Sequence, residues 1–264
     1  MDPSIAILGI PFDQNSSFMK GAAQAPEAIR SAFHSPSSNY CAESGRNLGG
    51  SEYIECEDLE AVNYPNDIEK GIDSLLEKGM RIVSLGGDHS VTYPIIRSYR
   101  KQYPTLHVLQ LDAHPDLYPE FEGNRFSHAC PFARILEEGL ITSLTQVGIR
   151  STAQVQQEQA EKYNVQVYSQ KRWLKEPLLN LEEPLYLSLD LDVLDPAFAP
   201  GVSHHEPGGM TTRDVLQIIQ GIEVPLVGAD IVELNPSRDH NQITAMVAAK
   251  FLKEILDTML TENE

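Results

Sequence analysis

The fold is decided by residues 106–116, LHVLQLDAHPD. The apolar part of this stretch predicts a buried parallel strand, and the C-terminal ends of such strands are where open α/β sheets place their chemistry. Asp112, His114 and Asp116 alternate: an extended chain would turn all three to one side, whereas a turn after Asp112 would let them surround a point. Carboxylate oxygens mixed with imidazole suit a divalent metal such as manganese, iron or zinc. A motif this short is also compatible with a polar strand end.

Strand-like and helix-like segments alternate along the rest of the chain. Neither an internal repeat nor linker composition interrupts the alternation, which predicts one doubly wound α/β domain over residues 1–264 with a mainly parallel sheet. The expected strands are 5–10, 53–57, 81–85, 106–111, 144–149, 165–168, 185–192 and 225–234. One expected helix begins near Pro26, and the others cover 66–78, 91–103, 131–138, 152–162, 212–220 and 241–260.

Composition narrows the range of partners and compartments. The 264 residues carry a formal net charge of -18, which argues against nucleic acid as a partner and would favour the approach of a cationic small molecule. The three cysteines are too few for a disulfide framework, so a reducing cytoplasm is expected. No window approaches about 18 consecutive apolar residues, and the N-terminal residues lack the pattern of a signal peptide. We therefore expect neither a membrane span nor export.

Ligand-type side chains follow four of the predicted strands. Besides the motif after residue 111, His89 follows the strand 81–85, Asp190 and Asp192 lie in the strand 185–192, and Glu233 ends the last strand. Burying several carboxylates in one crevice is costly unless cations compensate their charge. Five carboxylates and two imidazoles exceed what one metal needs. The pattern predicts two divalent cations roughly 3.5 Å apart with a water held between them.

Three segments resemble the signatures of the ureohydrolase family, which includes arginases, agmatinases and formimidoylglutamases. They are GGDHS at 86–90, DAHPD at 112–116 and SLDLDVLDP at 188–196. The segments occur in the family's order, and GIPFD at 9–13 and ELNP at 233–236 extend the similarity over essentially the whole chain. The resemblance implies a three-layer α/β/α, arginase-like fold and a hydrolase with two manganese ions per subunit.

The resemblance also implies a role for each motif residue. One ion would be held by His89, Asp112, Asp116 and Asp190, and the other by His114, Asp112, Asp190 and Asp192. A hydroxide bridging the ions would attack the guanidinium carbon, and the products would be urea and an amine. His128 matches a histidine that shuttles a proton to the departing amine, a task suited to a side chain that titrates near neutral pH. Glu233 matches the acid that grips the guanidinium, and Asp116 counts among the catalytic groups as well as the ligands.

The substrate is less well specified than the family. Arginases usually carry asparagine where this chain has Tyr118, which is more like agmatinases. The segment PGVS at 200–203 is reminiscent of formimidoylglutamases, but those generally lack the equivalent of His128. Hydrolysis of agmatine to putrescine and urea, a reaction of polyamine metabolism, is therefore favoured. Hydrolysis of arginine to ornithine and urea comes next, followed by formimidoylglutamase or guanidino-acid hydrolase activity.

The remaining expectations concern the pocket rim and the assembly. His204 and His205 stand where relatives usually have small residues and proline. The expected substrate contacts are Tyr118, Asn124, His204, His205 and Glu233. The family implies a homotrimer or homohexamer. A metal-binding relative without catalytic activity is the alternative outside the enzymes, and metal-dependent deacetylases share the layered fold.

Overall fold

Eight parallel strands form one sheet in the computed structural model, which describes residues 4–50, 52–173 and 181–261. The order across the sheet is β2-β1-β3-β8-β7-β4-β5-β6. The strands are β1 Ile5–Gly9, β2 Tyr53–Glu55, β3 Arg81–Leu85, β4 His107–Leu111, β5 Ser143–Ile149, β6 Gln166–Ser169, β7 Leu185–Asp190 and β8 Leu226–Val232. Every described pairing is parallel, which confirms the predicted fold class.

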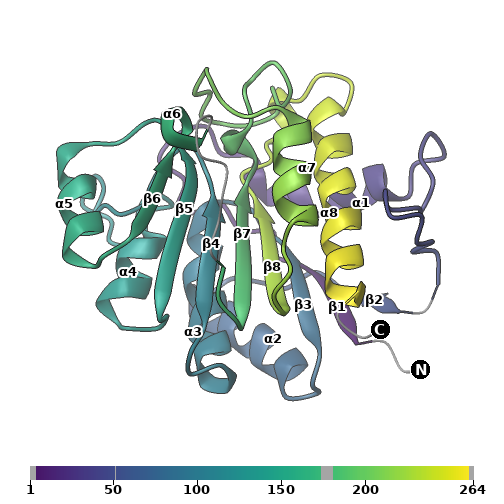
Figure 1. Cartoon of the computed structure of the whole chain (residues 1–264), viewed down its shortest axis with the longest axis horizontal. Coiled ribbons are helices and arrows are strands. Elements are labelled where there is room, and N and C mark those ends of the chain that lie inside the picture. The colour runs from purple at the N-terminus through teal and green to yellow at the C-terminus, as the bar shows by residue number, and fades with distance from the viewer. Residues whose placement is uncertain (1–3, 51, 174–180, 262–264) are drawn as a thin grey trace.

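Helices cover both faces of this sheet and give it three layers (Figure 1). On one face α8 packs against α1 and α7, and on the other α3 packs against α2 and α4. The helices are α1 Ala25–Phe33, α2 Asn66–Leu76, α3 Thr92–Gln102, α4 Pro131–Glu137, α5 Gln154–Lys162, α6 Gln170–Trp173, α7 Thr212–Gln220 and α8 Ile243–Thr261. None of the helices in the described ranges is long and apolar enough to cross a membrane.

The strands supply side chains to two separate hydrophobic cores. In β1, Ile5 and Ile7 join the core beneath α1, α7 and α8, while Ala6 and Leu8 join the core beneath α2, α3 and α4. Alternate residues of a strand point to opposite faces, and here both faces are covered. This is why β1 is a continuous apolar run in which apolar and polar residues do not alternate.

The four central strands end level with one another. Leu85 of β3 pairs with Ile231 of β8, Ile231 pairs with Leu189 of β7, and Leu189 pairs with Leu111 of β4. These residues come from distant parts of the sequence, yet they form one row across the middle of the sheet. Whatever follows this row lies along one edge, so the sheet register brings the predicted ligand segments together.

The strand predicted over 185–192 ends two residues early. β7 stops at Asp190, and Leu191–Val193 forms a 3-10 turn. The cause is the Asp190 side chain, whose Oδ1 accepts a hydrogen bond from the backbone N–H of Asp192 at 2.7 Å. An aspartate that bonds the backbone two residues ahead competes with continued strand pairing.

The chain also turns after β4, which settles the two conformations considered for this stretch. Asp112 Oδ1 accepts the backbone N–H of His114 at 2.6 Å, and Asp116 adopts a left-handed backbone conformation with φ of 52°. The three ligand-type side chains therefore surround a point and do not line one face of an extended strand.

Candidate metal centre

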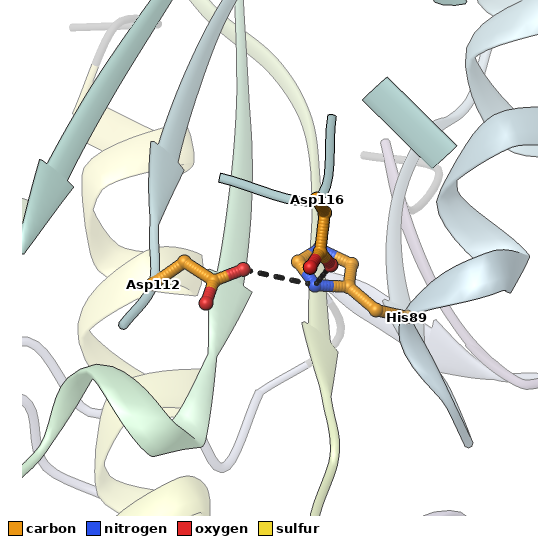
Figure 2. A group of neighbouring side chains, drawn as sticks. All are labelled: His89, Asp112 and Asp116. Atoms are coloured by element: carbon orange, nitrogen blue, oxygen red, sulfur yellow. Dashed lines mark ion pairs between the residues drawn. The ribbon is translucent and has the colours of Figure 1, made fainter. Parts of the chain in front are cut away.

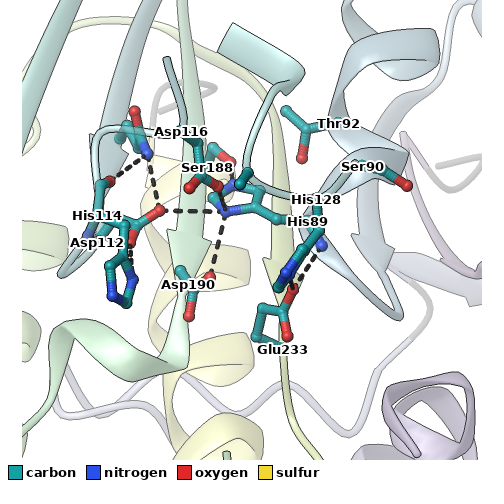
Figure 3. A network of polar contacts seen from close by, with 12 residues as sticks. His89, Ser90, Thr92, Asp112, His114, Asp116, His128, Ser188, Asp190 and Glu233 are labelled. Atoms are coloured by element: carbon teal, nitrogen blue, oxygen red, sulfur yellow. Dashed lines mark hydrogen bonds and ion pairs between the residues drawn. The ribbon is translucent and has the colours of Figure 1, made fainter. Parts of the chain in front are cut away.

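The six predicted metal ligands meet at the C-terminal edge of the sheet. Figure 3 labels five of them, all except Asp192. His89 lies in a 3-10 turn after β3, the residues of DAHPD follow β4, and Asp190 and Asp192 lie at the end of β7. His114 is partly exposed, and the other five side chains are buried. Two glycines precede His89, and a Cβ added to Gly87 would lie 1.9 Å from the carbonyl oxygen of Phe12. The tight packing of this turn therefore requires glycine at position 87.

Three carboxylates converge on one imidazole nitrogen. His89 Nδ1 lies 3.1 Å from Asp112 Oδ2, 3.0 Å from Asp116 Oδ2 and 3.2 Å from Asp190 Oδ2. Figure 2 shows the first two side chains, both of which follow β4, with their carboxylates directed at the ring. Although it is buried, Nδ1 makes no hydrogen bond of good geometry with any described residue. One imidazole nitrogen and three carboxylate oxygens around a point form a donor set that suits a divalent transition metal.

A second group of ligand atoms lies beside the first. His114 Nδ1 is 3.0 Å from Asp192 Oδ2 and 3.6 Å from Asp112 Oδ1. The two oxygens of Asp112 therefore face different histidines, Oδ2 towards His89 and Oδ1 towards His114. A carboxylate placed in this way can bridge two cations. The residues present thus fit two adjacent metal positions.

A buried hydrogen-bond chain sets the orientation of His89. Its Nε2 lies 3.0 Å from Ser188 Oγ, and the Ser188 hydroxyl donates to Asp230 Oδ1 at 2.8 Å. Because a hydroxyl has one hydrogen to give, Ser188 must accept from the ring, and Nε2 carries the proton. Nδ1 is then the nitrogen left to face the carboxylates. Asp230 is fully buried, and it is held in turn by the hydroxyls of Thr92 and Tyr186.

When no cation is bound, protons on the histidines and carboxylates reduce the negative charge of this cluster. Burial and the Asp192 carboxylate raise the pKa of Asp190, and burial and Asp112 raise the pKa of Asp116 to about 6. Burial disfavours the charged form of His114, but Asp192 and Asp112 outweigh it and raise its pKa to about 12. Two divalent cations would replace these protons as counter-charge, so metal binding here is expected to release protons.

Two glutamines fix the turn that carries DAHPD. Gln110 Nε2 donates to Asp112 Oδ2 at 2.7 Å and to the carbonyl oxygen of His114 at 3.1 Å. Gln146 Nε2 donates to Gln110 Oε1 at 2.6 Å and to the carbonyl oxygen of Pro115 at 2.7 Å. Metal ligands held by further hydrogen bonds keep their orientation.

A pocket of about 340 Å³ opens beside the centre. Among the predicted substrate and catalytic residues, Tyr118, His128, His204 and Glu233 line it. Asn124 and His205 are not among the lining residues. Asn124 bonds Asn15 and the backbone of Phe126, and His205 bonds the carbonyl oxygen of Pro200.

His128 and Glu233 form an ion pair in this pocket. His128 Nδ1 lies 2.8 Å from Glu233 Oε1, which also accepts the backbone N–H of His89 at 2.9 Å. Burial disfavours the charged imidazole, but the Glu233 carboxylate outweighs it and raises the pKa of His128 to about 9. The pair therefore places a protonated imidazole and a carboxylate next to the two metal positions.

Several residues of this site were not among those predicted from the sequence. Ser17, Ser151, Thr152 and Gln156 line the pocket, but they lie in polar segments with nothing to distinguish them from surface residues. The sequence pattern could have identified Ser188 and Asp230. Ser188 precedes Asp190 by two residues and so shares its side of the strand; Asp230 is an acidic residue inside an apolar strand.

Removing a shared ligand should empty the centre. We expect Asp190→Ala to lose most bound manganese and nearly all activity, because Asp190 contacts His89 and caps the turn that carries Asp192. The matched control is Asp195→Asn, since Asp195 accepts only backbone N–H groups, at Ala197, Gly208 and Gly209. Elemental analysis of purified protein measures the metal. Retention of both ions and of wild-type turnover by Asp190→Ala would exclude the assignment.

Removing the hydrogen bonds from Ser188 and Asp230 that support His89 should weaken metal binding without removing a ligand. We expect Ser188→Ala and Asp230→Asn each to lower manganese affinity about 10- to 100-fold, because the ring loses the bond that fixes its protonated nitrogen. Calorimetric titration of manganese into metal-free protein gives the affinity. Ser84→Ala is the control, since Ser84 is equally buried on β3 and its hydroxyl has no partner in the described ranges. Equal manganese affinities for all these variants would contradict the proposed role of the Ser188 and Asp230 hydrogen bonds.

Comparison with known proteins places this chain in a family. Residues 3–257 match the model of the arginase family. Mitochondrial arginase 1 of Arabidopsis thaliana is 42% identical over 96% of this chain and 80% of its own length. An agmatinase of Bacillus anthracis is 33% identical over 97% of this chain and 91% of its own length. The solved structure of an arginase from Medicago truncatula matches with a TM-score of 0.92 and 39% identity. The match covers 97% of this chain and 87% of that chain. The protein described here belongs to the arginase family of ureohydrolases.

Proposed function

We propose that this protein hydrolyses a guanidino compound to urea and an amine with two manganese ions held by the six ligands described above. The observation that carries the proposal is the His128–Glu233 ion pair next to the donor set in a single pocket. The pair offers a carboxylate for a cationic substrate and a proton for a departing amine. A binding protein without catalytic activity could use the carboxylate but would need no proton donor at this position.

The residues of the chain divide the work of this reaction. When bound, the two cations supply a water activated for attack near neutral pH. Glu233 uses Oε1 for its bonds to His89 and His128, which leaves Oε2 available to a guanidinium N–H. A planar guanidinium pairs well with a carboxylate and would be oriented by it. His128 holds the proton that the amine takes up as the C–N bond breaks.

For the substrate we propose arginine first and agmatine second. Tyr118 favoured agmatine, but plant relatives named arginase are 40–42% identical to this chain, whereas Bacillus relatives named agmatinase are 33% identical. The pocket lining adds support for a substrate with an α-carboxylate. The hydroxyls of Ser151 and Thr152 can donate to such a group. Agmatine lacks this carboxylate, so it would give those hydroxyls no carboxylate to bond.

The proposal includes an assembly and a location. We propose a homotrimeric or homohexameric assembly, which sedimentation analysis would measure. The cytoplasmic location expected from the cysteines stays a prediction. The Arabidopsis relative is named as mitochondrial.

A substrate screen tests the proposed reaction. We expect manganese-loaded protein to release urea from arginine with a higher kcat/KM than from agmatine or guanidinobutyrate, and to act poorly on formimidoylglutamate, followed through formamide. Protein treated with a chelator is the control and should be inactive. If agmatine gave the highest kcat/KM, the order of substrates would reverse, and no turnover of any of the four would refute the proposed function.

Replacing the proton donor should separate catalysis from metal binding. His128→Asn should lower kcat about 100- to 10,000-fold, the usual contribution of a general acid, with both metals retained. His128 donates only when protonated, and its pKa is raised to about 9. Wild-type kcat should therefore fall as pH rises through about 9, and the variant should lack this fall. Metal loss in the variant, or wild-type turnover at every pH, would remove His128 from this role.

A further inference from the structure

Both ring nitrogens of His128 are engaged by neighbouring side chains. Nδ1 lies 2.8 Å from Glu233 Oε1, and Nε2 lies 2.8 Å from Ser17 Oγ. A carboxylate can only accept, so Nδ1 carries a hydrogen directed at Glu233. The protonated ring then donates its second hydrogen, on Nε2, to the Ser17 hydroxyl. Neither N–H of the imidazolium is left to reach a substrate directly.

Ser17 is more accessible from the pocket than His128. The His128 side chain is buried, and the ring of His204 covers it with 5.1 Å between ring centroids. Ser17 is exposed, and it lines the same pocket as Glu233 and Asp190. Its hydroxyl accepts from His128, which leaves the hydroxyl hydrogen for a group inside the pocket. Ser17 thus lies between the proposed acid and the space for the substrate.

The loop that carries Ser17 is held at Asn15 by several hydrogen bonds. The carbonyl oxygen of Asn15 accepts the backbone N–H of His128 at 3.0 Å, so Ser17 and His128 belong to one hydrogen-bonded unit. The backbone N–H of Asn15 donates to buried Asp88 at 3.0 Å, and its side chain donates to Ser90 at 3.1 Å. Asn124 donates to the Asn15 side chain at 3.3 Å. This arrangement fixes the Ser17 hydroxyl two residues further along.

We propose that Ser17 is a catalytic residue that holds His128 through Nε2 and relays its proton to the departing amine. The proposal rests on the urea-forming reaction proposed above. As the C–N bond breaks, its electron pair goes to the amine nitrogen, which takes the hydroxyl hydrogen of Ser17. Ser17 Oγ takes the hydrogen of His128 Nε2 at the same time. His128 ends neutral, Ser17 is unchanged, and one proton has moved from the imidazolium to the amine.

Three single variants and one double variant test this relay. Ser17→Ala should lower kcat about ten- to hundred-fold, part of the contribution of a general acid, with KM and bound manganese little changed. Ser17→Thr keeps the hydroxyl and should restore most of kcat. Ser16→Ala is the matched control: Ser16 lies in the same loop, but its hydroxyl contacts Asp88 at 3.4 Å and not His128. Among these three single variants, only Ser17→Ala should show a weaker fall of kcat above pH 9.

The double variant separates a relay from general support of the pocket. In a His128→Asn background Ser17→Ala should cause no further loss of kcat, because residues that act in one step are not additive. A further ten-fold loss there, or a kcat for Ser17→Ala within two-fold of wild type, would overturn the inference and leave the proposed function standing. Absence of urea release by the wild-type protein would overturn the proposed function and this inference with it.

Discussion

The structure depends on placing several buried negative charges within a few ångströms of each other. Asp112, Asp116 and Asp190 approach one nitrogen of His89 at 3.0–3.2 Å in a region that water hardly reaches. Like charges at this distance cannot all ionise without compensation. In the protein alone the histidines supply it, and two divalent cations would supply more. The surrounding fold is arranged so that this costly cluster stays ordered: glutamines brace the turn after β4, and Asp230 braces the ring of His89 through Ser188.

The parts of this site that the sequence predicted share one property: their chemistry conflicts with their surroundings. Asp112 and Asp190 follow or end apolar strands where carboxylates are out of place, and that conflict distinguishes them in the sequence alone. The parallel sheet then required such strand ends to share an edge. His128 lies in a polar loop, where a histidine is unremarkable, and only the family resemblance distinguished it.

What sequence patterns could not supply were contacts between loops far apart along the chain. Ser17 meets His128 across 111 positions of sequence, and nothing in a polar loop indicates such a partner. The end of β7 was predicted two residues late because the apolar pattern continues through Leu191, while a side-chain bond from Asp190 turns the backbone first. His205 and Asn124 were expected at the pocket, yet His205 bonds the backbone of Pro200 and Asn124 bonds the side chain of Asn15. In each case side-chain hydrogen bonding, which periodicity does not encode, decided the position.

The level ends of the four central strands have a consequence for how the sheet assembles. A slip of one residue moves a strand end by about 3.3 Å and turns its side chains to the opposite face. That displacement is as large as the separations between His89 and its three carboxylates. A sheet paired out of register would therefore lack the binding site altogether. Any cation that binds this site stabilises only the correctly paired sheet, so metal in the medium would favour native strand pairing over misaligned alternatives.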